Sequence, residues 1–195
     1  MLKSIVLICC HNGENYIYDQ ISSILNQTIK IDQIEIHDYN SSDNTIKIIE
    51  EFRKKYKNIE LKSFDYAISV CHSFFNSINR IKETYKNSNY ILYLSDQDDY
   101  WNIEKNEIVI DYFAKGYEFI FHDVIVSDEN LKTISSSFYS NFWKIDRDFR
   151  LPNIFFSNPV IGHTMAVSKK VIENFDLNYD ERIPMHDWYI SIQIL

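Results

Sequence analysis

Residues 91–101, with the sequence ILYLSDQDDYW, form an apolar run that ends on three carboxylates, Asp96, Asp98 and Asp99. A buried strand that ends in this way places acidic side chains at a possible binding pocket. Carboxylates so close together repel one another, and the repulsion is relieved where a cation lies among them. The run therefore favours a divalent metal site. Its alternative is a solvated acidic loop in which Ser95 or Asp96 caps the following helix.

Strand-like apolar runs alternate with amphipathic, helix-like stretches on both sides of this run. The expected strands are residues 4–9, 33–37, 59–63, 90–94 and 119–126, and the expected helices are residues 16–25, 45–56, 73–84 and 104–113. This alternation predicts an α/β fold with a single Rossmann-like, mostly parallel sheet flanked by helices. Ligands bind at the carboxyl ends of the strands in such sheets, which is where three polar loops fall: 10–15, 38–43 and 96–101.

The alternation stops near residue 127. We expect one domain over residues 1–195, with a first part at about 1–126 and a second part at about 127–195. The second part is expected to hold a strand at 162–167 and a short helix from Lys169. Residues 188–195 keep an apolar pattern to the end without a capping residue, which favours a chain truncated at its C-terminus.

The composition excludes several classes of protein. Hydrophobic residues make up 45% of the chain and charged residues 25%, which is typical of a globular domain, and the net charge of −8 argues against nucleic acid as a partner. Three glycines are too few and too scattered for a dinucleotide fingerprint or a phosphate loop. Three cysteines without a C-x-x-C pair predict a reducing, cytoplasmic compartment. No apolar stretch approaches the length of a membrane span.

Five motifs occur in a fixed order along the chain. They are CHNGENY at 10–16, ILNQT at 24–28, DYNSSDNT at 38–45, SDQDDYW at 95–101 and MHDW at 185–188. Together they resemble the family 2 glycosyltransferases, which are nucleotide-sugar enzymes of the GT-A fold. SDQDDYW with a late HDW most resembles the bacterial rhamnosyltransferase-like enzymes of cell-surface polysaccharide synthesis.

The resemblance implies a donor site built from the loops after the first, second and fourth strands. The first part of the chain would bind the nucleotide sugar, and the second part would face the acceptor. Asp98 and Asp99 would bind Mn²⁺ or Mg²⁺ and the diphosphate. The implied nucleotide- or donor-binding residues are His11, Asn12, Glu14, Asp38, Tyr39, Ser41, Asp96 and Asp98.

The resemblance also assigns Asp187 as the catalytic base. This carboxylate would deprotonate the acceptor hydroxyl opposite the leaving group, which gives a single displacement with inversion. Without a resemblance, Asp187 reads as a helix cap. Trp101, His186 and Trp188 are candidate acceptor or sugar contacts, and core packing is the alternative for their rings.

Two positions depart from the family pattern. His11 stands where an aromatic residue is common and Tyr39 where a second aspartate is common, which puts the choice of base in question. One alternative function is therefore a catalytically impaired, transferase-like binding module. Another is a metal-dependent phosphohydrolase, prompted by two His-Asp pairs, His122-Asp123 and His186-Asp187.

The expected partners are a nucleotide-diphosphate sugar donor and a glycan or lipid-linked acceptor. A basic cluster at residues 53–57 suggests peripheral contact with the inner face of a membrane. Cations at a helix C-terminus also complement the helix dipole, which is the ordinary reading of this cluster. The expected location is thus the cytoplasm, with a peripheral membrane position as its variant. The sequence does not fix an oligomeric state.

Overall fold

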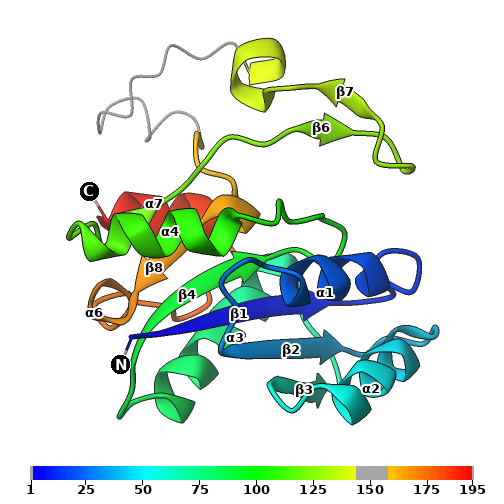
Figure 1. The fold of residues 1–195 in the computed structure, drawn as a ribbon. Coiled ribbons are helices and arrows are strands. Elements are labelled where there is room, and N and C mark those ends of the chain that lie inside the picture. Colours follow the sequence, from blue (N-terminus) through cyan, green and yellow to red (C-terminus); the bar gives the residue numbers. More distant parts are fainter. Residues whose placement is uncertain (1, 144–157, 195) are drawn as a thin grey trace.

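The computed structural model describes residues 2–143 and 158–194. In these residues, a central sheet has the strand order β3-β2-β1-β4-β8-β5 (Figure 1). The strands are β1 (Leu2–Cys10), β2 (Gln33–Tyr39), β3 (Ile59–Phe64), β4 (Asn89–Ser95), β5 (Phe119–Ile120) and β8 (Ala166–Ser168). The strands β1 to β4 are parallel, and β8 is antiparallel to both of its neighbours. The predicted mostly parallel sheet is confirmed.

Helices cover both faces of the sheet. Side chains alternate along the central strand β1, so that Val6 and Ile8 face one side, Ile5 and Leu7 face the other, and none of the four is exposed. The first face packs against α1 (Ile17–Leu25), α2 (Thr45–Lys55) and α4 (Lys105–Ala114). The second packs against α3 (Val70–Thr84), α6 (Lys169–Ile172) and α7 (His186–Ile194).

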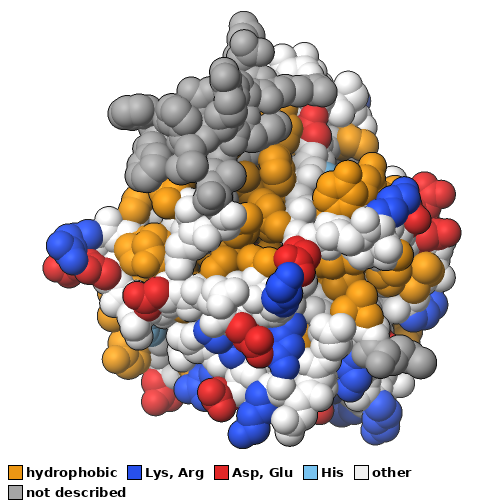
Figure 2. Space-filling model, turned by 90° about the vertical axis from the view of Figure 1, so that its left-hand side faces the viewer, with side chains coloured by type: hydrophobic (Ala, Val, Ile, Leu, Met, Phe, Trp, Pro, Cys, Tyr) orange, Lys and Arg blue, Asp and Glu red, His pale blue; other side chains and the backbone are white. Residues whose placement is uncertain are grey.

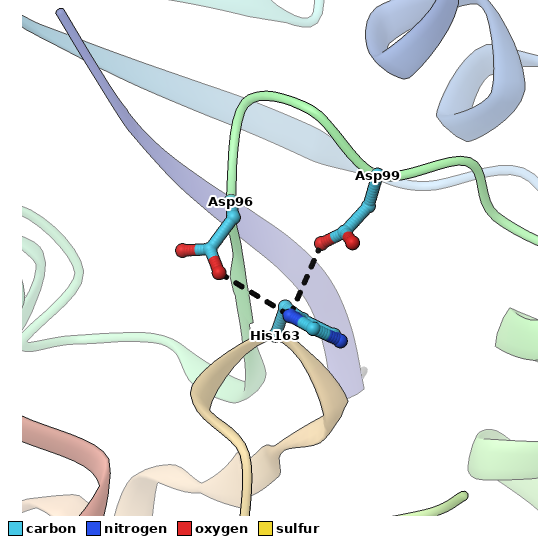
Figure 3. Close-up of side chains that lie close together, drawn as sticks. All are labelled: Asp96, Asp99 and His163. Carbon is cyan, nitrogen blue, oxygen red and sulfur yellow. Dashed lines mark hydrogen bonds and ion pairs between the residues drawn. The ribbon is translucent and has the colours of Figure 1, made fainter. Parts of the chain in front are cut away.

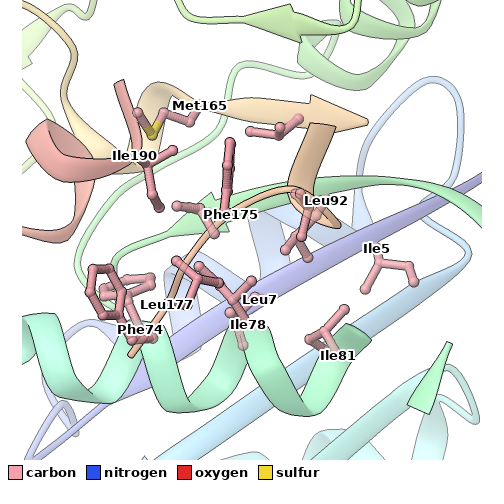
Figure 4. Packing of buried hydrophobic residues seen from close by; sticks show 14 of the residues in the cluster. Ile5, Leu7, Phe74, Ile78, Ile81, Leu92, Met165, Phe175, Leu177 and Ile190 are labelled. Carbon is pink, nitrogen blue, oxygen red and sulfur yellow. The ribbon is translucent and has the colours of Figure 1, made fainter. Parts of the chain in front are cut away.

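The helix α3 shows how the sequence sets this packing. It begins at Val70 because the Ser69 side chain accepts the His72 N–H and so caps the first turn. Phe74, Ile78 and Ile81 then recur at helical spacing and lie against the sheet (Figure 4). Full burial of each such side chain stabilises the fold by about 1.5–3 kcal/mol.

The chain leaves the sheet after β5. A separate hairpin follows, formed by β6 (Val126–Ser127) and β7 (Thr133–Ser135), and then a π-helical turn, η1 (Tyr139–Trp143) (Figure 1). Asp123 fixes the base of this hairpin, since its Oδ1 accepts the N–H groups of Phe138 (3.0 Å) and Tyr139 (3.2 Å). The expected continuous strand over residues 119–126 is therefore wrong.

The second expected strand, at residues 162–167, is wrong in its first half. Gly162–Thr164 forms a 3-10 turn, η2, and only Ala166–Ser168 pairs as β8. The turn forms because the Gly162 N–H donates to the Asp187 carboxylate (2.9 Å) and the Gly162 carbonyl accepts the Met165 N–H. A contact from α7 thus overrides the local β pattern.

Charge is mixed over the face shown in Figure 2, where basic and acidic side chains alternate below a band of hydrophobic side chains. Among the described residues, no helix combines the length and the apolar composition needed to cross a membrane.

Candidate active site

Two loops at the carboxyl edge of the sheet are joined by hydrogen bonds. The Asn12 N–H donates to Ser41 Oγ (2.8 Å), and Asn12 Oδ1 accepts the Ser42 N–H (2.8 Å). Asn12 has a φ of 49°, a left-handed conformation that asparagine adopts more readily than most residues. We call these joined loops, residues 11–14 and 40–44, the rim.

Asp38 and Glu14 hold the rim in shape. Asp38 is fully buried, and its Oδ2 accepts the Ser41 N–H (3.1 Å). Glu14 Oε2 accepts the backbone N–H (2.9 Å) and the side-chain amide (2.7 Å) of Asn44. Charged acceptors make strong, oriented hydrogen bonds. Both carboxylates therefore support the rim, and their direct contact with a nucleotide stays a prediction.

Gln97 attaches the acidic loop to the rim. Its Oε1 accepts the His11 N–H (3.0 Å), and its Nε2 donates to the His11 carbonyl (3.2 Å). A methyl group on Gly13 would lie 2.5 Å from Gln97 Oε1, so a larger residue there would displace the Gln97 side chain from these bonds. The exposed His11 ring is oriented by its Nδ1, which lies 2.7 Å from the Tyr39 carbonyl oxygen.

Three side chains meet beside the rim: Asp96 and Asp99 of the acidic loop, and His163 of η2 (Figure 3). His163 Nδ1 lies 3.2 Å from Asp96 Oδ2 and 3.4 Å from Asp99 Oδ2. Within the described residues, this is the one group of His, Cys, Asp or Glu side chains close enough to hold a metal ion. Asp98 is exposed and lies outside it. The group thus shares only Asp99 with the predicted metal pair of Asp98 and Asp99, and metal binding by that pair stays a prediction.

The electrostatics of this group fit a cation. Burial raises the pKa of the Asp99 carboxyl to about 6, against the opposing attraction of His163. Burial also opposes charge on Asp96, but the His163 hydrogen bond brings the pKa of Asp96 below its usual value. Burial opposes charge on His163 as well, but the two carboxylates outweigh it and raise the pKa of His163. Asp99 Oδ2 is buried and accepts no hydrogen bond from the described residues. A metal ion would supply the interaction that this oxygen lacks.

Lys105 supports the group from the first turn of α4. Its Nζ donates to the His163 carbonyl (3.1 Å) and lies 3.9 Å from the centroid of the Trp101 ring. Burial lowers the pKa of Lys105 to about 7, although the Asp99 charge acts in the opposite direction. Through these contacts, Lys105 fixes the backbone of His163 relative to the end of the acidic loop.

Two of the rings predicted to contact sugar are core residues. Trp101 is 3% exposed and packs on Tyr93, with ring centroids 5.4 Å apart. His186 is also 3% exposed and stacks on Phe74 at 3.9 Å, and neither of its ring nitrogens has a hydrogen-bond partner among the described residues. Both rings are enclosed, as the core-packing alternative implied, and their contact with a sugar stays a prediction. Trp188 is partly exposed on α7, and its contact stays a prediction.

Tyr39 is the last residue of β2 and is buried, not part of a loop. Its hydroxyl donates to the Ser73 carbonyl (2.8 Å) and bonds Ser77 Oγ (2.9 Å), both on α3. The ring stacks on Phe64. The hydroxyl is thus engaged by α3, and its contact with a nucleotide base stays a prediction. Tyr39 acts on the rim through its carbonyl, which orients His11.

Asp187 is 3% exposed, and both of its carboxylate oxygens are engaged. Oδ2 accepts the Gly162 N–H (2.9 Å), and Oδ1 accepts the Asn158 amide (2.9 Å) and the Trp188 N–H (2.7 Å). These bonds attach the first turn of α7 to the turn that carries His163. Asp187 thus has a structural role, as the cap alternative implied, and its role as catalytic base stays a prediction.

His163 and Lys105 were missed by the sequence analysis. His163 falls in a segment with a β pattern, and Lys105 reads as an ordinary solvated cation at a helix start. A weak signal was available in Gly162, one of three glycines in the chain. A methyl group there would lie 2.6 Å from His186 Nε2, so this glycine marks a close approach of η2 to α7.

The fold and these loops agree with one family of proteins. Residues 5–175 match the model of glycosyl transferase family 2, and the chain belongs to this family. The family predicted from the five motifs is thereby confirmed.

Two curated relatives cover most of the chain. The dTDP-rhamnosyl transferase RfbG of Shigella flexneri is 28% identical over 188 residues, which is 92% of this chain and 62% of that protein. An uncharacterized glycosyltransferase of Haemophilus influenzae is 28% identical over 192 residues, which is 94% of this chain and 57% of that protein. The chain therefore spans less than two thirds of the length of either relative.

Solved structures share the fold. TarS of S. aureus in complex with UDP-GlcNAc gives a TM-score of 0.71 at 16% identity, over 98% of this chain and 53% of the TarS chain. The mannosyltransferase PcManGT of Pyrobaculum calidifontis, in complex with GDP-Man and Mn²⁺, gives 0.68 at 12% identity, over 96% and 50%. At these identities the likeness establishes the fold, which is the GT-A type that the sequence predicted.

Proposed function

We propose that the chain is a metal-dependent, inverting glycosyltransferase. It would move a hexosyl or deoxyhexosyl group from a nucleotide-diphosphate sugar to a hydroxyl of a glycan or lipid-linked glycan, in the synthesis of bacterial O-antigen or capsule. The observation that carries the proposal is the meeting of the rim with the Asp96, Asp99 and His163 group at one edge of the sheet. The name of the Shigella flexneri relative, a dTDP-rhamnosyl transferase, supports a deoxyhexosyl group.

The chain's own residues divide the work of this reaction. The rim would bind the nucleotide, with the exposed His11 ring beside the base. A divalent cation between Asp96 and Asp99 would neutralise the charge that develops on the departing diphosphate. Asp187 would take the proton of the acceptor hydroxyl, which attacks opposite the leaving group. For this step Asp187 has to exchange one of its three hydrogen bonds for the acceptor.

A thermal-shift screen of nucleoside diphosphates and their sugars, with Mn²⁺ or with EDTA, tests the donor half of the proposal. A ligand at 100 times its dissociation constant stabilises a protein by about 2.7 kcal/mol. We expect stabilisation by one base in Mn²⁺ and much less in EDTA. Stabilisation of equal size in EDTA would reject the metal role.

Activity assays separate the alternatives. Donor binding without transfer to any acceptor would favour the binding module, and metal-dependent phosphate release without an acceptor would favour a phosphohydrolase. The described residues already weigh against the phosphohydrolase. Its two His-Asp pairs, His122-Asp123 and His186-Asp187, do not gather into a metal-binding group there, and Asp123 is engaged by the hairpin.

Peripheral membrane contact is the last part of the proposal. In the basic cluster at 53–57, Arg53 pairs with Glu50 (2.6 Å) and Glu60 (3.4 Å), while the cluster's three lysines are exposed. Co-sedimentation with anionic vesicles tests whether these lysines face lipid. Loss of binding when all three are changed to Gln would support the contact, and unchanged binding would reject it.

A further inference from the structure

We infer that His163 supplies a nitrogen ligand to the divalent cation, beside Asp96 and Asp99, and that this ligand makes the site prefer Mn²⁺ to Mg²⁺. The inference rests on the proposed function, which calls for a cation beside the departing diphosphate. It exchanges Asp98 for His163 in the ligand set and adds a choice of metal that an acidic loop alone does not make.

The three ligand atoms have the spacing of neighbouring positions around one ion. Nδ1 of His163 lies 3.2 Å and 3.4 Å from the two carboxylate oxygens, and all three atoms lie within 4.8 Å of one another. Ligands that bind at about 2.1 Å and at right angles are about 3 Å apart. The side chains point toward one another from two different segments (Figure 3). The set therefore converges on one point.

Neighbouring residues hold both segments in place. On the side of η2, Lys105 binds the His163 carbonyl and Asp187 binds the Gly162 N–H. On the side of the acidic loop, the side-chain amide of Gln97 accepts the His11 N–H and donates to the His11 carbonyl. Outer contacts of this kind orient the ligands of a metal site. The imidazole is thus held at the site before any ion arrives.

The chemistry of the set decides the metal. Mg²⁺ takes oxygen ligands and retains several waters, whereas an imidazole nitrogen binds first-row transition ions more strongly. Two carboxylates alone would accept either kind of ion. The nitrogen of His163 adds affinity for Mn²⁺ and adds little for Mg²⁺.

A different role for His163 makes the opposite prediction. A protonated ring between two carboxylates would act as a counter-ion that occupies the place of a metal. Removal of such a ring would free both carboxylates and tighten metal binding. Removal of a ligand weakens it. The sign of the change in Mn²⁺ affinity therefore separates the two roles.

The test titrates the full chain with Mn²⁺ alone at pH 8, above the ordinary pKa of histidine. Electron paramagnetic resonance reports free Mn²⁺, and Mg²⁺ is added as a competitor. We expect His163→Ala to weaken Mn²⁺ binding by at least about tenfold and to change Mg²⁺ binding little. His163→Asp, which offers oxygen in place of nitrogen, should shift the preference toward Mg²⁺. The control Asp98→Asn removes a nearby charge and should leave the ratio of the two affinities unchanged.

Unchanged or tighter Mn²⁺ binding by His163→Ala overturns the inference, as does an altered affinity ratio in Asp98→Asn or a parent chain that binds no Mn²⁺. Circular dichroism verifies folding, and His163→Asp carries the comparison if His163→Ala is unfolded. Nucleotide titration separates this inference from the proposed function. Mn²⁺ binding through His163 without any nucleotide binding rejects only the proposed function. Metal-dependent nucleotide binding with an unchanged preference in both variants rejects only the inference.

Discussion

The carboxyl group of Asp99 lies in a buried position, which disfavours its ionised form. Its pKa is about 6 in the folded chain, against an ordinary value of 3.8. A raised carboxyl pKa means that ionisation costs stability at pH values above 6, by up to about 3 kcal/mol for two pKa units. This cost diminishes as the pH falls through 6 toward 4, where the folded chain holds the proton. Without a cation, the ionised Asp99 therefore destabilises the fold at neutral pH.

We expect Asp99→Asn to raise the unfolding free energy of the metal-free chain at pH 7.5 by about 1–3 kcal/mol. The lower end allows for the lost ion pair with His163. The gain should shrink at pH 4.5, because the parent carboxyl is then protonated in the folded state. Urea unfolding in EDTA at both pH values measures it. A variant that is less stable than the parent at pH 7.5 would show that the ion pair outweighs burial.

Asp187 calls for a test that separates chemistry from structure. Asp187→Asn places an NH₂ group against one of the N–H donors that the carboxylate now accepts, so we expect a loss of about 1–3 kcal/mol in unfolding free energy. If Asp187 is the base, the variant should also lose about 10²–10⁴-fold in transfer rate per folded molecule. Urea unfolding and a rate normalised to the folded fraction give both quantities. A normalised rate equal to the parent's would leave Asp187 a structural residue only.

Site residues that stand out from their neighbours in the sequence could be predicted, and those that only the fold brings to the site could not. Asp96 and Asp99 could be recognised because several like charges in one short loop are visible in the sequence itself. The burial of Tyr39 and Trp101 could not be predicted from their neighbours in the sequence, because helices from elsewhere in the chain cover them. His163 was missed because only the fold carries it to the acidic loop.

At the scale of elements, β2 and α3 are joined through the hydroxyl of Tyr39. We expect Tyr39→Phe to lower the unfolding free energy by about 1–2 kcal/mol, because the Ser73 carbonyl and the Ser77 hydroxyl lose a partner. The ranking of nucleoside diphosphates in a thermal-shift screen should stay as in the parent. A changed ranking with unchanged stability would return Tyr39 to the nucleotide site.

The hairpin β6–β7 depends on one carboxylate at its base. We expect Asp123→Ala to speed amide hydrogen exchange at Phe138 and Tyr139, whose N–H groups it accepts, and to leave the amides of β1 protected. Asp128→Ala is the matched control, since Asp128 accepts N–H groups only within the hairpin turn, those of residues 130 and 132. Exchange mass spectrometry resolves the two regions. Equal acceleration at the hairpin base in both variants would contradict the assignment.

The elements themselves were predictable through α4 and less so beyond it. From β1 to α4, apolar periodicity is a local property and marks each strand and helix within a few residues of its ends. Beyond α4, the Asp187 carboxylate accepts the Gly162 N–H, which a continuous strand would have used, and Asp123 accepts the N–H groups of Phe138 and Tyr139 at the base of the hairpin. Such long-range captures leave no periodic trace in the sequence.

For the whole molecule, acid weakens the fold. Burial lowers the pKa of His37, His122 and His186, so each takes up a proton less readily in the folded chain than in the unfolded chain. Burial raises the pKa of Glu35, but the neighbouring His37 ring (3.7 Å), the Tyr85 hydrogen bond and Lys62 outweigh it and bring this pKa to about 2. The unfolded state therefore binds more protons as the pH falls, and stability falls with it.

We expect the unfolding free energy to fall between pH 7.5 and 4.5. His122, with its pKa of about 4, removes about 2 kcal/mol over this range, and His37, His186 and Glu35 add to the loss, against an opposing gain at Asp99. His122→Gln should flatten this dependence. Urea unfolding across the pH range measures both chains. A stability that rises toward acid would mean that Asp99 and His163, whose raised pKa values act in the opposite direction, dominate instead.

The strand β8 lies between β4 and β5, although it comes from much later in the chain than either. During synthesis on the ribosome, one edge of β4 therefore waits unpaired until residues 166–168 emerge. An open strand edge is a template for pairing with another nascent chain. The same late arrival carries His163 to the acidic loop. A nascent polypeptide thus closes its sheet and completes its charged centre in one late event, and until then it is the kind of client that chaperones shield.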